Sequence, residues 1–236
     1  MTLNGEVKDF IKENLKGTIK KKIENYDFSK KSGNPFVDTI FKRFSNVKSF
    51  IHSMATTFGD DYEKIARKIA ESNPEFEEVK KFNFTGKISD DESALIKNMV
   101  KELEESKEGS DYDEEIKLVY GADENNIKDT KITIDLYLRN QEGKEFFIEM
   151  KGPDPNKKEV RAAKEDLLNV VAMKKREINK EDFHDKVAII FGIYYNNCKG
   201  EYKNWKVSPL FERGKGLLVQ EEFWDLLGVK GHLTSY

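Results

Sequence analysis

The chain is poor in the residues that build disulfide frameworks and thiolate or imidazole metal sites. Its 236 residues include one cysteine, Cys198, and three histidines. A single thiol excludes an internal disulfide framework and a cysteine-rich zinc site. Cys198 has no histidine nearby in the sequence, so we do not expect it to act as a nucleophile. His52, His184 and His232 are far apart along the chain, and we interpret each as a structural or surface residue.

Long apolar runs are also missing. No stretch approaches the roughly 18 consecutive apolar residues that a membrane-spanning helix needs. The opening residues, MTLNGEVKDFIKENLKG, lack the basic segment and apolar segment of a secretory signal. We therefore expect a cytoplasmic protein.

The composition is that of a folded, highly charged protein. Charged residues make up 36% of the chain and aromatic residues 11%, and the formal net charge is −3. The aromatic content argues against disorder, because these side chains need a core in which to be buried. We expect one domain over residues 1–236, with a helical N-terminal part (1–88), a core (89–195) and a C-terminal loop and helix (196–236).

The N-terminal part is predicted to be helical. Apolar residues recur at helical spacing over residues 7–23 and again, more strongly, from Asn34-Pro35 to Gly59. Asparagine before proline suits the start of a helix, and glycine suits its end. A shorter helix is predicted over 65–73, and the segment 82–86 is expected to be a loop.

From residue 89 onward the pattern predicts helices and strands in alternation. Ser-Asp-Asp-Glu at 89–92 is a capping box that opens a helix. Residues 116–120 are a short strand candidate. The runs ITIDLYL (132–138) and EFFIEMK (145–151) predict a hairpin, because both are rich in β-branched and aromatic residues.

The remaining pattern completes an α/β fold. Gly-Pro-Asp-Pro-Asn interrupts the chain after the hairpin, and a long helix begins at Asn156. The apolar run 186–195 is typical of a buried central strand, and a last helix is predicted near 221–227. We therefore predict a mixed sheet flanked by helices.

Three charged residues lie within the predicted hairpin. Asp135 is in its first strand, while Glu149 and Lys151 are two residues apart in the second and so point to one face. Hydrolysis of a phosphodiester is helped by a divalent cation, and Mg²⁺ needs only one or two carboxylates because it keeps several waters. A neighbouring lysine can stabilise charge on the phosphate or assist the attacking water.

A structural alternative exists for these three residues. They would form cross-strand ion pairs on a solvated face, and such spacings arise by chance in a chain with 36% charged residues. The order of the elements favours the functional interpretation. The Asp and the Glu-x-Lys motif lie on consecutive strands, a helix follows, and an apolar strand follows that helix.

This order resembles the nuclease core of the PD-(D/E)xK superfamily over roughly residues 89–195. The resemblance implies that Asp135 and Glu149 bind Mg²⁺ and that the main-chain carbonyl of Met150 is a further ligand. It also implies that Lys151 assists the attacking water. Duplex DNA would be the substrate.

A narrower resemblance concerns type II restriction endonucleases. The superfamily motif is named for a proline before its aspartate, and this chain has Ile134 there. The family often varies this position. The stretch IEMKGPDPNKKEV, the helix after it and the tail EFWDLLG are similar to those enzymes, most of all to the TdeIII-like group. The resemblance implies site-specific cleavage with 5′-phosphate ends, a homodimer matched to a palindromic target, and allows a GGNCC-type site.

Glu92 has two interpretations. Many members of the superfamily draw a glutamate from the helix before the first core strand into the metal site, so Glu92 is a candidate catalytic residue. Its position three residues after Ser89 also completes the capping box, a role that needs no part in chemistry.

Basic residues are concentrated after the motif. Residues 151–180 hold nine Lys or Arg against five acids, whereas residues 87–115 hold four Lys against eleven acids. A basic surface suits phosphate contacts. Asn156, Lys157 and Lys158 are the best candidates, because a helix N-terminus also attracts phosphate. The alternative is an ordinary solvated helix face.

The tail loop supplies candidates for reading the base sequence. Asn204, Lys206 and Arg213 carry the amide and cationic groups that bind base edges in the major groove. Such residues are equally ordinary in loops.

Three rival functions stay open. A repair or junction-resolving nuclease could use the same core, because fold does not fix function. A non-catalytic DNA-binding or protein-interaction module is disfavoured by the intact Asp, Glu and Lys. A glycosidase-like hydrolase could use Asp135 and Glu149 as acid and base, but Lys151 and the scarcity of nearby aromatic residues argue against it.

Overall fold

The computed structural model describes residues 5–27, 42–106 and 109–228. The contacts within the chain divide it into two compact units, Leu3–Lys68 and Ile69–Tyr236. Among the described residues, no helix is long and apolar enough to cross a membrane.

The first unit is helical, as predicted. It contains α1 (Gly5–Asn25) and most of α3 (Lys42–Glu71), and the Nζ of Lys22 on α1 donates a hydrogen bond of 3.1 Å to the Oγ1 of Thr57 on α3. The predicted helix end at Gly59 is wrong, because α3 continues without interruption to Glu71. A single glycine costs a helix only about 1 kcal/mol, which a helix of this length tolerates. The predicted start at 34–35 lies outside the described residues.

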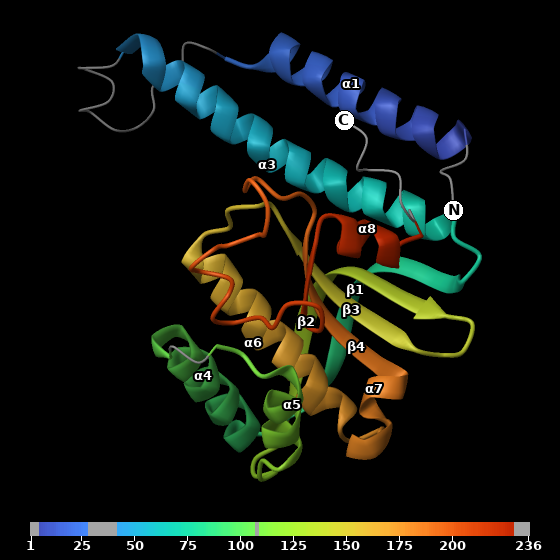
Figure 1. The fold of residues 1–236 in the computed structure, drawn as a ribbon, viewed down its shortest axis with the longest axis vertical. Coiled ribbons are helices and arrows are strands. Elements are labelled where there is room, and N and C mark those ends of the chain that lie inside the picture. Colours follow the sequence, from blue (N-terminus) through green and yellow to red (C-terminus); the bar gives the residue numbers. More distant parts are fainter. Residues whose placement is uncertain (1–4, 28–41, 107–108, 229–236) are drawn as a thin grey trace. The chain divides into compact units, whose positions relative to one another are not determined.

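The second unit is built on a mixed sheet of five strands in the order β1-β2-β3-β4-β5 (Figure 1). Strands β1 (Phe76–Ile88), β2 (Lys128–Asn140) and β3 (Glu145–Lys151) pair antiparallel. Strands β4 (Val187–Ile193) and β5 (Leu217–Val219) continue the sheet in parallel with β3. The predicted hairpin, central strand and mixed sheet are confirmed.

Two sequence predictions in this unit are wrong. The segment expected to be a loop is part of β1, an edge strand in which more buried and more exposed residues alternate from Phe82 to Ile88. The expected strand at 116–120 is part of helix α5 (Tyr112–Tyr120). Asp111 caps this helix by accepting a hydrogen bond from the backbone N–H of Glu114 at 3.0 Å. The helical N-terminal part therefore ends at Glu71, and the first strand precedes the helix that begins the predicted core.

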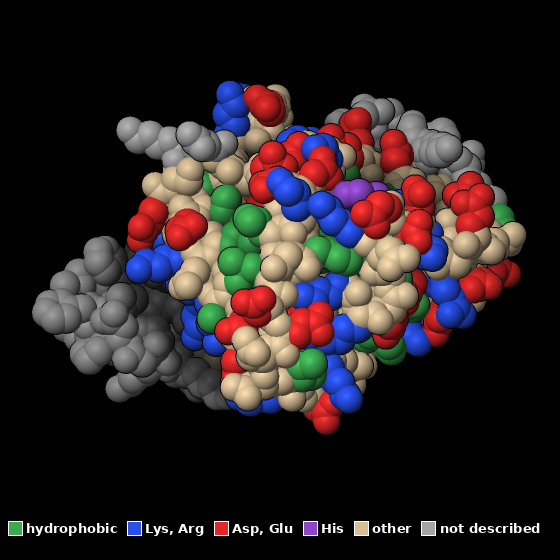
Figure 2. All heavy atoms as spheres, turned by 90° about the horizontal axis from the view of Figure 1, so that it is seen from below, with side chains coloured by type: hydrophobic (Ala, Val, Ile, Leu, Met, Phe, Trp, Pro, Cys, Tyr) green, Lys and Arg blue, Asp and Glu red, His purple; other side chains and the backbone are tan. Residues whose placement is uncertain are grey.

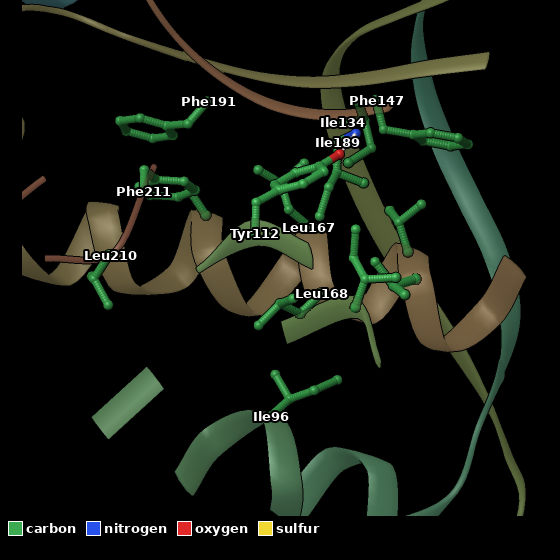
Figure 3. Packing of buried hydrophobic residues seen from close by; sticks show 14 of the residues in the cluster. Ile96, Tyr112, Ile134, Phe147, Leu167, Leu168, Ile189, Phe191, Leu210 and Phe211 are labelled. Atoms are coloured by element: carbon green, nitrogen blue, oxygen red, sulfur yellow. Dashed lines mark hydrogen bonds between the residues drawn. The ribbon is translucent and has the colours of Figure 1, made fainter. Parts of the chain in front are cut away.

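Three helices cover one face of the sheet. They are α4 (Asp90–Glu105), α5 and α6 (Lys157–Lys174), with α6 against the strands. Leu167 of α6 lies on the side of the buried strand residues Ile134 and Ile189, whereas Leu168 lies on the side of Ile96 of α4 (Figure 3). Burial of this apolar surface is the main force that fixes α6 against β3.

The short helix α8 (Glu221–Leu226) packs on the opposite face, against β4 and β5. A Cβ added to Gly192 of β4 would lie 2.7 Å from the ring of Phe223, so only glycine leaves room for this contact. The predicted last helix is confirmed. A 3₁₀ turn (Lys180–Asp182) and α7 (Phe183–Lys186) connect α6 to β4.

Candidate active site

Strand β2 contains an irregularity at Asp135. Lys80 and Phe82 of β1 are two residues apart, but their partners on β2, Tyr137 and Ile134, are three apart. Strand β2 therefore has one extra residue here, a β-bulge that includes Asp135. Ile134 and Tyr137 both lie in the core cluster on one side of the sheet, which regular alternation would forbid. Such bulges re-aim side chains beside active sites.

The bulge brings Asp135 to the end of β3. Its Oδ2 accepts hydrogen bonds from the backbone N–H of Met150 at 3.0 Å and from the Nζ of Lys151 at 2.9 Å. The same Nζ lies 3.2 Å from the Oε2 of Glu149. The structure thus brings together four of the five residues that the sequence placed in the site, all except Glu92, and Lys151 bridges the two carboxylates.

Burial makes the electrostatics of this group strong. Burial, and then repulsion by Asp135, raise the pKa of Glu149 to about 8. Burial opposes ionisation of Asp135 as well, but attraction by Lys151 and its hydrogen bonds hold the pKa of Asp135 below its ordinary value. Burial alone would lower the pKa of Lys151, but Glu149 and Asp135 raise it above its ordinary value. Near neutral pH the charged forms of Asp135 and Lys151 are therefore stable, whereas the charged form of Glu149 is not.

The oxygen atoms present fit a hard divalent cation. Among the described residues, no group of three or more His, Cys, Asp or Glu could hold a metal ion, but Mg²⁺ needs only one or two carboxylates. The N–H and C=O of a strand residue point to the same side, so the carbonyl of Met150 faces Asp135 as its N–H does. A cation would relieve the repulsion that raises the pKa of Glu149. Oxygen-only ligands favour Mg²⁺ or Mn²⁺ over zinc.

One acidic residue near this group was missed at the level of sequence. Asp166 of α6 interacts electrostatically with Lys151 and Asp135. Burial, and then the neighbouring Glu165, raise the pKa of Asp166 to about 6. A signal was present, because Asp166 lies three residues after the buried Ala163, four before the buried Val170 and so within the apolar stripe of the helix.

Glu92 does not join this group. It is fully buried and completes the capping box of α4 with Ser89. Its two carboxylate oxygens lie 2.7 Å from the Nζ of Lys175 and 2.8 Å from the Nη2 of Arg176. Lys175 and Arg176 follow the C-terminal end of α6, whereas Lys151 precedes the N-terminal end of the same helix. A helix of 18 residues is about 27 Å long, so the structure supports the capping interpretation of Glu92.

The predicted phosphate-binding residues lie at the start of α6. Asn156 is the N-cap: its side chain accepts a hydrogen bond of 2.9 Å from the backbone N–H of Glu159. The Nζ of Lys157 lies 3.7 Å from Glu104, and its side chain is half-exposed. Lys158 is exposed, and within the described chain we find no ion pair for it.

Most of the basic charge on α6 is neutralised within the protein. Lys164 pairs with Glu115 of α5 in the core, and Arg161 approaches Glu104 of α4 at 3.8 Å. The basic and acidic segments seen in the sequence therefore face each other. Acidic and basic side chains also alternate on the face that includes α5 and α7 (Figure 2). The excess of basic charge after the motif does not by itself mark a DNA-binding surface.

The predicted base-reading residues of the tail loop are engaged within the protein to different degrees. Asn204 is buried, and its amide donates hydrogen bonds to the carbonyl of Pro153 at 3.2 Å and to Asp154 at 3.3 Å. Lys206 pairs with Asp154, and Arg213 pairs with Glu222. Asn204 is thus a structural residue of the loop, whereas the side chain of Arg213 is 40% exposed.

One known protein family matches nearly the whole chain. The family model described as "Type II restriction endonuclease, HinfI" matches residues 3–234. The chain belongs to the HinfI family of type II restriction endonucleases. The matching model describes the HinfI family and does not name the TdeIII-like group, which the sequence motifs resemble.

Two curated restriction enzymes are similar to this HinfI-family chain, both from Herpetosiphon aurantiacus. Type II restriction enzyme HgiEI is 24% identical over 105 residues, and HgiCII is 26% identical over 115 residues. The matches cover 44% and 49% of this chain but only 37% and 40% of the two relatives. No solved structure matches.

Proposed function

We propose that this protein is a divalent-metal-dependent endonuclease that cuts duplex DNA at a specific sequence. The observation that carries the proposal is the meeting of Asp135, Glu149 and Lys151 at one end of β2 and β3, in a chain of the HinfI family. Two carboxylates and a lysine at hydrogen-bonding distance are what metal-assisted phosphodiester hydrolysis needs.

Each residue has a defined part in this proposal. Asp135, Glu149 and the carbonyl of Met150 would hold the cation, with Asp135 fixed in place by its hydrogen bond from the backbone of Met150. A divalent cation held there supplies positive charge to the scissile phosphate and favours ionisation of a nearby water.

Lys151 provides the protein's own cation beside the phosphate. Its raised pKa keeps it charged, so it stabilises negative charge that builds on the phosphate oxygens rather than acting as a base. The water oxygen bonds to phosphorus and releases a proton to solvent, while the bond from phosphorus to the 3′ oxygen breaks and that oxygen takes up a proton from solvent. The products carry a 5′-phosphate and a 3′-hydroxyl.

A homodimer is part of the same proposal. A palindromic DNA site has two-fold symmetry, so two identical subunits place one active site on each strand. We place the enzyme in the cytoplasm, where a restriction enzyme meets incoming DNA.

The proposal is tested by digestion of a long DNA of known sequence with purified protein. We expect discrete fragments with Mg²⁺ or Mn²⁺, and no cleavage in EDTA. Sequencing of the fragment ends gives the recognition site, including whether it is of the GGNCC type. A smear would indicate a nuclease without sequence specificity, cutting at branched DNA alone would indicate a junction-resolving enzyme, and undiminished activity in EDTA would exclude the metal site.

A further inference from the structure

The loop after β4 is fastened to the turn that follows Lys151. The hydroxyl of Tyr202 and the amide of Asn204 both donate hydrogen bonds to the carbonyl of Pro153, at 2.9 and 3.2 Å. The side chain of Lys206 pairs with Asp154. The turn at Pro153–Asp154 joins the catalytic strand to α6, so this loop lies at the end of the sheet where α6 begins (Figure 1).

Trp205 lies between two of these anchoring residues but does not take part in the anchoring. Its side chain is 73% exposed, more than that of any other large hydrophobic residue in the described chain. The backbone around it is held in a turn, because the carbonyl of Asn204 accepts hydrogen bonds from the N–H groups of Val207 and Ser208 at 3.0 and 2.8 Å. The loop therefore presents the indole to solvent on a rigid support.

The other tryptophan of the chain is placed in the opposite way. Trp224 is 6% exposed, and its indole N–H donates a hydrogen bond to the carbonyl of Tyr194 at 2.8 Å. An indole with a structural role is buried and bonded in this manner. Trp205 is exposed, and among the described residues its indole has no hydrogen-bond partner, although Asn204 and Lys206 on either side of it are fixed to the protein.

Trp205 lies within reach of DNA bound at the catalytic residues. From Lys151 the path runs through Gly152 to Pro153, across one hydrogen bond to Asn204 and on to Trp205, which limits the Cα separation to roughly 20 Å. Bases along one strand are spaced by about 3.4 Å, so this span corresponds to about six nucleotides. The length of a duplex with its scissile phosphate at Lys151 is therefore sufficient to reach the indole.

We propose that Trp205 is a DNA-contact residue that packs its indole against bases close to the scissile phosphate. Aromatic side chains stack on bases or wedge between base steps, and an apolar surface also contacts the thymine methyl group. This inference rests on the proposed nuclease function. It adds a residue that the sequence candidates for base recognition did not include.

The two tryptophans allow a direct test. The probe is a synthetic duplex that contains the site found by digestion, with Ca²⁺ in place of Mg²⁺ so that binding is separated from cleavage. We expect the fluorescence of the wild-type protein to change on binding and the change to be lost in Trp205→Phe, which keeps only the buried Trp224. Affinity is measured in parallel from the anisotropy of a labelled duplex.

Cleavage provides the second measurement. Trp205→Ala should weaken binding and cleavage on the order of ten-fold, with an unchanged melting temperature because the side chain is exposed. Trp205→Phe should retain most of the activity, since a phenyl ring still stacks. Leu118→Ala on α5 is the matched control, because Leu118 is also an exposed apolar residue (44%) but lines a pocket with Lys180, beyond the opposite end of α6, and it should cut as the wild type does.

The results separate this inference from the function on which it rests. Wild-type binding and cleavage by Trp205→Ala, with fluorescence that does not respond to the duplex, would overturn the role of Trp205 and leave the nuclease intact. A dimer that dissociates on the same substitution without DNA would also overturn it, and would assign the indole to a contact between subunits. Failure of the wild-type protein to bind or cut any DNA would instead remove the proposed function.

Discussion

The carboxylate of Asp135 accepts a hydrogen bond of 3.0 Å from the backbone N–H of Met150 on the neighbouring strand. In a regular antiparallel ladder, the backbone N–H of Met150 would donate to a main-chain carbonyl of β2. Because of the bulge in β2, it donates to the side chain of Asp135 instead. The orientation of Asp135 is therefore fixed by the main chain, and does not depend on Lys151 alone. Substitutions of Asp135 and of Lys151 should therefore have different effects on the site.

Asp135→Asn should remove cleavage while preserving the fold. The amide has the shape of the carboxylate but lacks the charge that a cation requires, so we expect cleavage to fall by at least about 100-fold. The circular dichroism spectrum and binding to duplex DNA should be retained. Asp129→Asn, which changes an exposed acid on the same strand, is the matched control and should cut normally. Wild-type cleavage by Asp135→Asn would remove this residue from the metal site.

Lys151→Met should be inactive but should still bind the cation. The substitution removes the charge that stabilises the reacting phosphate and leaves Asp135 held by Met150. Binding of Mn²⁺ in solution, followed by calorimetry or electron paramagnetic resonance, should be as tight as in the wild type or tighter, because the lysine no longer competes for the carboxylates. Loss of Mn²⁺ binding would show that Lys151 organises the site rather than acting in the chemical step.

Binding of the cation should release a proton from Glu149. Without metal, the pKa of Glu149 is about 8, so at pH 7 the group is mostly protonated and must ionise in order to bind. Metal affinity should therefore rise with pH up to about 8 and then level off. Calorimetry in buffers of different ionisation enthalpy should find close to one proton released at pH 7 and few at pH 9. Glu149→Gln should abolish the release, and an affinity that is independent of pH in the wild type would contradict the assignment.

The elements that sequence predicted well carry local signals. Strand β3 has the predicted bounds, and α6 begins after Asn156, where the capping box with Glu159 is visible in the sequence. The Asp135, Glu149 and Lys151 group followed from these elements, because residues two apart on a strand share a face. Side-chain periodicity and cap residues are properties of a few neighbouring residues, so they need no knowledge of the rest of the fold.

The features that could not be predicted from the sequence depend on contacts between residues that are far apart along the chain. Strand β1 pairs with β2 across about fifty residues, and this long-range pairing is what makes residues 82–86 part of a strand rather than a loop. The bulge at Asp135 is visible only from that pairing. Likewise, the charge of Lys164 and Arg161 suggested a DNA surface until α6 was seen to pack against Glu115 and Glu104.

Glu92→Gln should lower stability without removing catalytic activity. The carboxylate is fully buried between Lys175 and Arg176, and loss of one partner in such a group costs about 3–5 kcal/mol. Glu124→Gln is the control, because Glu124 approaches the same cations but is 46% exposed, so its loss should cost no more than about 1 kcal/mol. Urea denaturation measures both effects. Loss of cleavage by folded Glu92→Gln would restore a catalytic role.

The same residue should contribute to acid unfolding. Burial opposes its ionisation, but Arg176, Lys175 and the backbone of Ser89 hold the pKa of Glu92 below its ordinary value. A lowered pKa in the folded state gives stability that is present above the unfolded value and is lost as the pH falls through the folded value. The free energy of unfolding should therefore decline below about pH 4.5, and less steeply in Glu92→Gln. Equal slopes would contradict the contribution.

Lys158→Ala should weaken binding to every DNA duplex by a similar factor. Lys158 is exposed beside the N-terminus of α6, next to the turn that follows the catalytic strand, and contacts between lysine and phosphate do not depend on sequence. The slope of the logarithm of the binding constant against the logarithm of salt concentration should fall by about 0.9 for one lost phosphate contact. Lys180→Ala is the control, because Lys180 is an exposed lysine beyond the opposite end of α6 and should leave the slope unchanged. An identical change in slope for both variants would mean that Lys158 acts only through net charge, and an effect confined to the recognition site would mean that it reads bases rather than phosphate.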